Sequence, residues 1–494
     1  MLIGSSGARR RAVVVVVTCV ALLAACSSSS KPAATSTSTT KPSVTTPDSN
    51  AAPVTVTWMP SYAAPGTPTK YNKVGIVKVG PSDAKNVFVF EPGTLAGGAY
   101  FVPMAKWIVS KAPGWQVWSI ERRENLIEDQ SRINLAKQGK ATPAQLYNYY
   151  LGFIKDPRIT PHLQIPPATA YPYAKQWGMK VAVEDLHTAI NAAKKLGGKV
   201  VLGGHSLGGT VVTAYATWDF NGKPGADGLS GLVYIDGGSF SRSGSSGASA
   251  AAATAQLQAL MAPATPPWLT FGGIPAPLAG VFIATGSAGV LLAPNQPSLG
   301  QVSGLLPKNI VPPVRASNAG QFGYALNVAT SPPELAAAQA HLGTGVAAQG
   351  PVHGWNGAGA LTPIDRFATM FYGTGIQSVD GSEWYFPARL TYDSIAVDNG
   401  NPNPAQSVLD VDTTMGHDLP KNLLIYAFGT SLGGQAVLDS AQALAAQSQI
   451  PASNLTLVNR ASTYAHNDPN GAYPTNAFFS ELLPFLTKVD AVKG

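Results

Sequence analysis

The chain has 494 residues, of which 45% are hydrophobic and 12% charged, and a formal net charge of +7 at pH 7. This positive charge is mild for the length and is not clustered, which argues against a nucleic-acid-binding protein. Only two cysteines occur, Cys19 and Cys26, both near the N-terminus, so the stability of the folded part does not depend on disulfides.

The N-terminus has the pattern of an export signal. Arg9-Arg10-Arg11 precedes an apolar stretch from Ala12 to Ala25, and Leu23-Ala24-Ala25-Cys26 is followed by four serines. This resembles a bacterial lipoprotein signal peptide, residues 1–25, that is cleaved before Cys26. The resemblance implies that Cys26 carries acyl chains and anchors the protein to a membrane, on the extracytoplasmic face of the cell envelope. An ordinary secretory signal and an uncleaved anchor are the alternatives, and the export route, general or twin-arginine, is open.

Residues 26–52 are expected to form a flexible tether. They are mainly Ser, Thr, Pro, Ala and Lys without a periodic apolar pattern, so they cannot bury a core. Cleavage before Cys26 leaves 30 basic and 26 acidic residues, a formal charge of +4. The folded part then begins near Pro53 and is long enough for a large core, or for one catalytic domain with an insertion.

Strand-like and helix-like segments alternate along much of the chain. Apolar runs typical of strands cover residues 54–58, 74–79, 86–90, 116–120, 199–202 and 229–235. Apolar residues recur at spacings of three or four on one face of a helix, at Met179, Val183, Leu186, Ile190 and Ala193. The alternation stops after Ile235 and resumes with a strand at 423–428, a helix at 435–447, a strand at 455–458 and a closing helix. This order predicts an α/β sheet with an insertion.

Gly204-His205-Ser206-Leu207-Gly208 lies where an apolar strand meets a helix-like run, 209–217. A serine placed on such a tight, strained turn can act as a nucleophile, and the flanking glycines are needed because side chains there would collide. The motif therefore indicates acyl-transfer chemistry at Ser206. A second copy, Gly429-Thr430-Ser431-Leu432-Gly433, also follows an apolar run, so the motif alone does not choose between the two serines.

The motif Gly-His-Ser-Leu-Gly-Gly and the chain order of the strands and helices resemble the α/β-hydrolase superfamily. The resemblance covers about residues 54–236 and 421–490. It implies an α/β fold: a mostly parallel central sheet with helices on both faces and a large inserted cap or lid. The core would comprise residues 53–236 and 421–494, and the cap residues 237–420, which resemble no family that we recognise.

In that superfamily the catalytic residues follow the order Ser, Asp or Glu, His, with the histidine after the last strand. Of the seven histidines, only His466 lies there. Ser431 would leave too few strands downstream to supply an acid loop, whereas Ser206 has the full order. His205 neighbours the nucleophile, but adjacent side chains on an elbow point apart, so it is expected to pack beside the sheet.

The acid is harder to assign. The turn after the next-to-last strand, its usual place, is 429–433 and holds no carboxylate, so the chain departs from the common pattern. Asp236 ends the preceding strand, a position that supplies the acid in lipases of the pancreatic type, and it is the preferred candidate. Asp439, expected inside a helix, and Asp468, close in sequence to His466, are the rivals. The acid is needed to fix the imidazole tautomer and to stabilise the imidazolium.

An oxyanion hole requires two backbone N–H groups aimed at the developing negative charge. Leu207 supplies one, because it follows the serine. The loop 92–95 is expected to supply the other, through Thr94 or, as the reserve, Leu95. The charged run 119–124 could aim a positive charge at the cleft, although such alternating charges more often pair with one another.

The expected cap, residues 237–420, is rich in Ala, Gly and Pro, and its start, 239–253, is a candidate hinge. Some of its aromatic residues are expected to line a pocket for an apolar substrate, and others to form its own core. They are Trp268, Phe271, Phe282, Phe322, Tyr324, Trp355, Phe367, Phe371, Tyr372, Trp384, Tyr385 and Phe386. No metal-ligand cluster, phosphate-binding loop or haem motif is present in the sequence, so no metal and no cofactor is expected.

These features predict a lipid-anchored serine hydrolase that cleaves a hydrophobic or lipid ester. Ser206 would be the nucleophile, His466 the base and Asp236 the acid, with an acyl-enzyme intermediate. Amide or thioester hydrolysis fits the same residues. An acyltransferase of the same fold and a non-catalytic binding lipoprotein are the alternatives; the sequence leaves the oligomeric state open.

Overall fold

The computed structural model describes residues 52–167, 169–239, 249–271 and 273–492. The expected signal peptide 1–25, the lipid-attachment residue Cys26 and the tether up to residue 51 lie outside these residues and stay predictions. So does most of the expected hinge, residues 240–248. Within the described ranges, no helix is long and apolar enough to cross a membrane.

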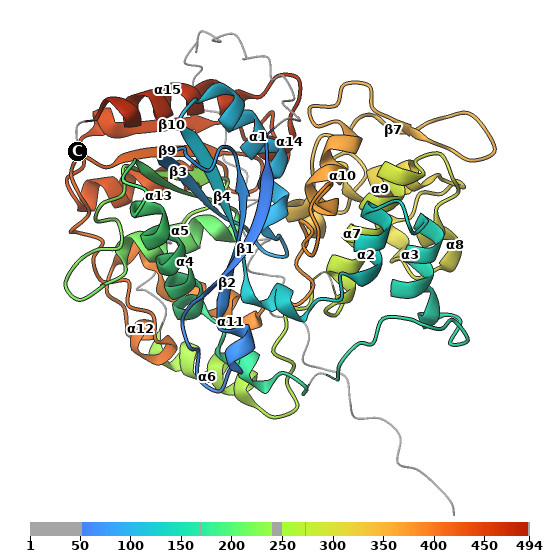
Figure 1. The fold of residues 1–494 in the computed structure, drawn as a ribbon, viewed down its shortest axis with the longest axis horizontal. Helices are drawn as coiled ribbons and strands as arrows, with labels where there is room; N and C mark the ends of the chain where they lie inside the picture. The colour runs from blue at the N-terminus through green and yellow to red at the C-terminus, as the bar shows by residue number, and fades with distance from the viewer. Residues whose placement is uncertain (1–51, 168, 240–248, 272, 493–494) are drawn as a thin grey trace, which may run out of the picture. The chain divides into compact units, whose positions relative to one another are not determined.

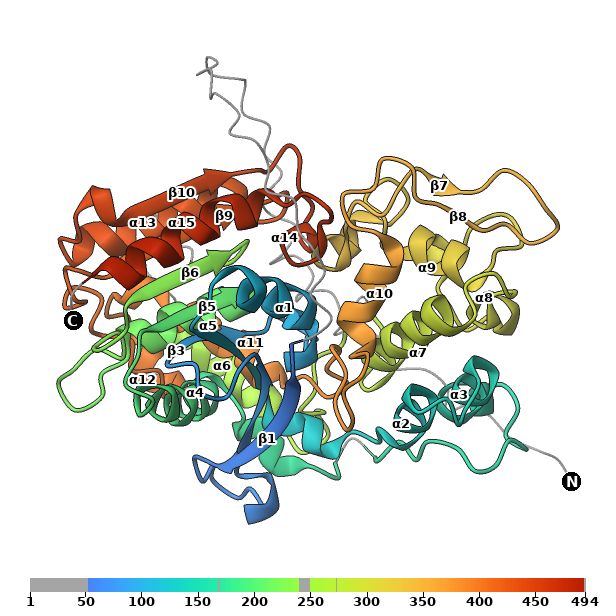
Figure 2. The ribbon, with the colours of Figure 1, turned by 45° about the horizontal axis from the view of Figure 1, so that its top comes forward.

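A mixed sheet of eight strands organises the fold, in the order β1-β2-β4-β3-β5-β6-β9-β10 (Figure 1, Figure 2). The strands are β1 (Val54–Pro60), β2 (Lys73–Val79), β3 (Asn86–Glu91), β4 (Trp115–Glu121), β5 (Val200–His205), β6 (Gly231–Ile235), β9 (Leu424–Gly429) and β10 (Leu455–Asn459). β2 is antiparallel to both of its neighbours, and all other neighbouring pairs are parallel. This mostly parallel sheet, with helices on both faces, is the α/β architecture expected from the sequence.

The continuous apolar runs reflect burial of the sheet on both faces. β5, β6 and β9 are buried at every residue. Because successive side chains of a strand point to opposite faces, Val89 joins one hydrophobic cluster while its neighbour Phe88 joins the other. Parallel strands covered by helices on both sides need apolar residues at both sets of positions.

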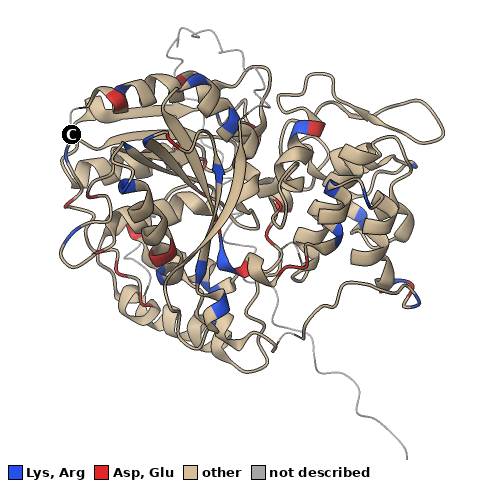
Figure 3. Ribbon diagram, in the orientation of Figure 1, with Lys and Arg blue, Asp and Glu red and all other residues tan. Residues whose placement is uncertain are grey.

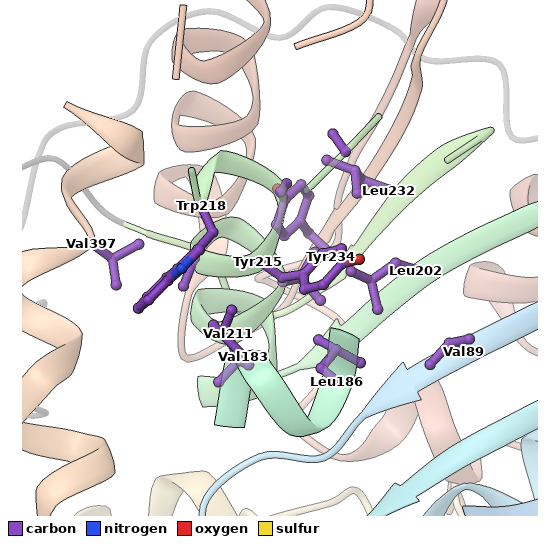
Figure 4. Close-up of a cluster of buried hydrophobic side chains, with 14 of the residues drawn as sticks. Val89, Val183, Leu186, Leu202, Val211, Tyr215, Trp218, Leu232, Tyr234 and Val397 are labelled. Carbon is purple, nitrogen blue, oxygen red and sulfur yellow. The ribbon is translucent and has the colours of Figure 1, made fainter. Parts of the chain in front are cut away.

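Helices cover the two faces of the sheet. α4 (Met179–Lys194), α5 (Leu207–Thr217) and α13 (Gly434–Gln447) share one hydrophobic cluster with the strands, and α1 (Val102–Lys111) and α15 (Ala477–Ala491) share the other. Figure 4 shows part of the first cluster, which includes Val183 and Leu186 of α4, Val211 of α5 and the strand residue Leu202. This packing fixes α5, and with it the turn that precedes α5.

A second group of helices, which we call the helical lobe, lies beside the sheet (Figure 1, Figure 2). α3 packs on α2 and α7, α7 also packs on α9 and α10, and α8 packs on α9. The lobe comprises α2 (Ser131–Lys137), α3 (Pro143–Tyr150), α7 (Leu278–Leu292), α8 (Leu299–Ser303), α9 (Asn318–Leu326) and α10 (Ile364–Tyr372), with the short strands β7 (Gly345–Val346) and β8 (Trp355–Asn356). It therefore draws on chain segments from both sides of Ser206.

Other helices of the segment 237–420 pack with the sheet domain. α6 (Ala250–Met261) packs on α11 (Ala388–Asp393) and α12 (Pro404–Leu409), and α11 also packs on α4. Buried residues of all three belong to the same hydrophobic cluster as α4 and α5. The segment therefore contributes both to the helical lobe and to the layer of helices on one face of the sheet.

Charged residues are sparse, 12% of the chain, and mixed in sign. Figure 3 shows Lys and Arg interspersed with Asp and Glu over the sheet domain and the helical lobe. This distribution agrees with the mild, unclustered charge noted in the sequence.

Candidate active site

Ser206 lies on a strained turn between β5 and α5. Its backbone has φ 57° and ψ −128°, and its N–H donates to the Ile235 carbonyl at 3.0 Å. A Cβ added at Gly204 would lie 2.3 Å from the Gly208 backbone, and one at Gly208 would lie 2.2 Å from the Glu91 carbonyl oxygen. The turn therefore excludes side chains at both flanking positions, which is the reason inferred from the sequence for these glycines.

His466 and Asp236 form a buried pair. His466 Nδ1 lies 2.6 Å from Asp236 Oδ2, and the two residues are 1% and 3% exposed. Because a carboxylate only accepts hydrogen bonds, Nδ1 carries the proton and Nε2 is left as the basic nitrogen. The preferred acid and base are thus brought together although 230 positions separate them.

The second Gly-x-Ser-x-Gly segment binds the carboxylate of Asp236. Asp236 Oδ1 accepts from the backbone N–H of Thr430 at 2.7 Å and of Gly433 at 3.0 Å, and the Thr430 hydroxyl donates to Oδ2. Ser431 is exposed and, unlike Ser206, has no positive φ. The turn after β9 therefore binds the candidate acid and lacks the strained backbone found at Ser206.

The environment of Asp236 keeps its carboxyl group ionised. Burial acts to raise its pKa, but the hydrogen bond and charge of His466 and the hydrogen bonds from Thr430 outweigh burial and hold the pKa below its usual value. A permanently ionised carboxylate can stabilise a histidine that becomes protonated during a reaction.

Ser206 is tied to this pair by its immediate neighbours. The ring of His205 lies 4.4 Å from that of His466, and His205 Nε2 is 2.9 Å from the His466 carbonyl oxygen. A Cβ added at Gly237, next to Asp236, would lie 1.9 Å from the Ser206 carbonyl oxygen. The turn that carries Ser206 therefore contacts both the loop of His466 and the residue after Asp236, at the carboxyl ends of the parallel strands.

His205 supports the loop that carries His466. Burial lowers the pKa of His205, so its imidazole is neutral and Nε2–H donates to the His466 carbonyl. The ring of Tyr100 stacks on His205 at 5.4 Å, and its hydroxyl is 2.6 Å from Asn467 Oδ1. The sequence gave no signal for Tyr100, because a single tyrosine outside any motif does not reveal a contact with a loop 367 positions away.

The two rival acids lie elsewhere. Asp468 accepts from His341 Nδ1 at 2.5 Å and from the Thr362 hydroxyl at 2.7 Å, so its carboxylate binds the segment 341–362 rather than His466. Asp439 is exposed on α13 and accepts from Gln435 at 2.9 Å. Neither contacts the candidate base through its carboxylate in the hydrogen bonds of the described residues.

The loop after β3 lies against Ser206. A Cβ added at Gly93 would be 2.8 Å from Ser206 Cβ and 3.4 Å from Ser206 Oγ. Leu95, two residues later, has a positive φ of 58°. Leu207 opens α5 directly after Ser206. The assignment of Leu207 and Thr94 as oxyanion donors stays a prediction.

The charged run 119–124 forms ion pairs. Arg122 pairs with Glu91 at 2.9 Å and with Glu383 at 2.7 Å, and Arg123 pairs with Asp185 at 2.6 Å. The expectation that these charges pair with one another is therefore wrong: Arg122 and Arg123 pair with acids outside the run, which no spacing in the sequence identifies.

The helical lobe encloses a largely apolar cavity of about 130 Å³ between α3, α7 and α9. Its walls include Tyr147, Leu151, Phe282, Phe322, Ala325 and Leu326. Phe271 also lines it, whereas Phe367 and Phe386 are fully buried in the hydrophobic clusters. Some aromatic residues of the segment 237–420 thus line a cavity, and others pack in the hydrophobic core. Among the described residues, no group of three or more His, Cys, Asp or Glu is placed to hold a metal ion.

No protein-family model matches the chain, and no curated protein matches it. Similar solved structures include a "putative lipase" from Sulfolobus solfataricus, which is 14% identical. The match covers 88% of this chain and 93% of that chain, with a TM-score of 0.45. A second is a monoglyceride lipase variant from Saccharomyces cerevisiae, with 9% identity, coverage of 85% of this chain and 92% of that chain, and a TM-score of 0.37. A third is a carboxyl esterase from Bacillus coagulans, with 11% identity, coverage of 88% of this chain and 99% of that chain, and a TM-score of 0.35. With TM-scores below 0.5, none of these likenesses bears on activity, and the site must be interpreted from its own geometry.

Proposed function

We propose that the protein is a serine hydrolase that cleaves a carboxylic ester with a hydrophobic acyl or alcohol part. The observation that carries this proposal is the buried hydrogen bond of 2.6 Å between His466 and Asp236, next to a serine on a strained turn. A base oriented by an acid near a half-buried serine nucleophile is an arrangement that suits acyl transfer.

The proposed reaction has two half-reactions, and His466 transfers the proton in both. His466 Nε2 takes the proton of the Ser206 hydroxyl as the serine oxygen attacks the ester carbonyl, and then gives that proton to the leaving alcohol. Water, deprotonated by the same nitrogen, then attacks the acyl-enzyme and releases the acid with Ser206 restored. Asp236 stays ionised throughout, and the N–H groups of Leu207 and Thr94 would stabilise the oxyanion.

The apolar lining of the helical lobe's cavity motivates the hydrophobic part of the proposal, although none of Ser206, Asp236 and His466 lines this cavity. Its lining contains no Asp, Glu, Lys, Arg or His, so a charged group would find no partner there. A dry apolar cavity of similar size, about 150 Å³, binds benzene. We propose that this cavity receives an apolar part of the substrate, and that Cys26 anchors the enzyme to the cell envelope.

A fluorophosphonate probe tests the central assignment. The wild-type protein should be labelled at Ser206, and Ser206→Ala should abolish labelling and lower kcat on p-nitrophenyl esters by at least about 1000-fold. Ser431→Ala is the matched control, since that serine has the same motif but lies on the turn after β9, and it should keep both properties. Labelling that survives in Ser206→Ala would place the nucleophile elsewhere. A wild-type protein that is neither labelled nor active on any ester would favour a binding protein.

A further inference from the structure

The buried guanidinium of Arg122 joins two segments that are far apart in the sequence. Arg122 is 6% exposed and donates from Nε to Glu91 Oε1 at 3.0 Å and from Nη1 to Glu383 Oε2 at 2.7 Å. Nη1 also donates to the Gly93 carbonyl at 3.2 Å, and Nη2 donates to the Pro92 carbonyl. One side chain thus binds two carboxylates and two backbone carbonyls. The planar fork of a guanidinium can do this, whereas a lysine ammonium, a single point charge, cannot reach all four.

The carbonyls that Arg122 binds belong to the loop beside Ser206. In a trans peptide the C=O and the following N–H point in opposite directions. The carbonyls of Pro92 and Gly93 point toward Arg122, so the N–H groups of Gly93 and Thr94 point away from it. Gly93 itself is so close to Ser206 that a Cβ would lie 2.8 Å from Ser206 Cβ. Arg122 therefore sets the direction of backbone donors at the nucleophile.

The second segment is the link between α10 and α11, which leads out of the helical lobe. The N–H of Glu383 donates to the Leu95 carbonyl at 3.0 Å, and the N–H of Gly97 donates to the Gly381 carbonyl at 3.0 Å. Ala96 and Ser382 form an antiparallel bridge between these two contacts. The link therefore runs along the loop that follows β3, and its Glu383 carboxylate is bound by the same guanidinium.

We propose that Arg122 is a positioning residue, which holds the N–H groups of Gly93 and Thr94 in the orientation needed for oxyanion stabilisation and ties this loop to the link from the helical lobe. The inference rests on the proposed function, because it assigns a role in the same reaction. Arg122 acts through the loop and does not touch the reacting atoms.

Kinetics of Arg122→Lys and Arg122→Met test the role, with Arg123→Lys and Arg123→Met as matched controls. Arg123 is the adjacent buried arginine, 1% exposed and paired with Asp185 at 2.6 Å, but its hydrogen bonds go to Asn72 and Tyr62 rather than to the loop. Both Arg122 variants should lose about 100-fold in kcat, as on removal of an oxyanion donor, with little change in KM. Labelling by the fluorophosphonate should slow in parallel, because its tetrahedral adduct places an oxygen in the same site. The Arg123 variants should keep kcat per folded molecule.

Hydrogen exchange of the backbone amides of residues 93–97 in the same variants provides a readout that needs no activity. Exchange should become faster in the Arg122 variants and stay at the wild-type rate in the Arg123 variants. Unchanged exchange in the Arg122 variants, or an equal loss of kcat in both pairs, would overturn the positioning role while the hydrolase assignment stands. If wild-type protein fails to react at Ser206, the proposed function fails, and the exchange measurement still decides whether Arg122 holds the loop.

Discussion

Asp236, the proposed acid for His466, occupies an unusual place in the chain. It follows β6, and the turn after β9 contributes two backbone N–H groups and the Thr430 hydroxyl to its carboxylate. A buried carboxylate with several donors is strongly favoured in its ionised form. The turn after β9 contains no carboxylate, but it stabilises the negative charge of Asp236, which follows the neighbouring strand β6.

Asp236→Asn should lower kcat by about 10⁴-fold with little effect on folding, because the amide has nearly the same volume but favours the wrong tautomer of His466. Steady-state kinetics and a melting curve measure the two effects. Asp439→Asn, an exposed change on α13, is the control and should leave both unchanged. A near-normal rate in Asp236→Asn would remove Asp236 from the proposed catalytic residues.

The sequence could suggest Ser206, His466 and Asp236 because a motif, a chain order and a resemblance constrain them, and the structure pairs His466 with Asp236. It could not reach Arg122, Tyr100 or the donors of Thr430, whose contacts join segments that no repeat or spacing relates. His205 was expected to pack beside the sheet, and it does so while also bonding to the His466 carbonyl. The residues that hold the site in place depend on tertiary proximity, which a single sequence does not encode in any local pattern.

At the scale of elements, the predicted strands are confirmed, as are the helices now seen as α4, α5, α13 and α15. The helices of the lobe were not predicted. α7 shows why: its sequence, LAGVFIATGSAGVLL, is apolar or small almost throughout and is packed against α3, α9 and α10. A helix surrounded on several sides carries no polar face, so the period of 3.6 residues is lost from its sequence.

The cavity between α3, α7 and α9 gives a prediction about chain length. Ala325→Phe, which adds a ring to the α9 wall, should lower kcat/KM on long-chain p-nitrophenyl esters by about tenfold or more and leave the acetate ester unaffected. Ala446→Phe, on an exposed position of α13, is the control for an added ring. Equal effects on both ester lengths, or none, would show that the cavity does not receive the acyl part of the substrate.

At the scale of the whole molecule, the N-terminus should determine where the enzyme resides. Cys26→Ala removes the thiol and the processing site that the signal resembles, so the variant should lose incorporation of labelled palmitate and leave the membrane fraction. Cys19→Ala keeps the cysteine at the expected cleavage site and is the matched control. Membrane retention of Cys26→Ala without acylation would favour an uncleaved anchor instead.

The helical lobe is assembled from two stretches of chain, with α2 and α3 encoded before Ser206 and α7 to α10 after it. Deleting residues 237–420 would therefore not leave a stable sheet domain. Helix α3 would lose its packing partner α7, and the apolar surface around Tyr147 and Tyr150 would become exposed to solvent. During synthesis, α2 and α3 are likewise made more than 120 residues before α7, the helix on which α3 packs. Residues 237–420 alone would therefore not carry the whole lobe into another protein.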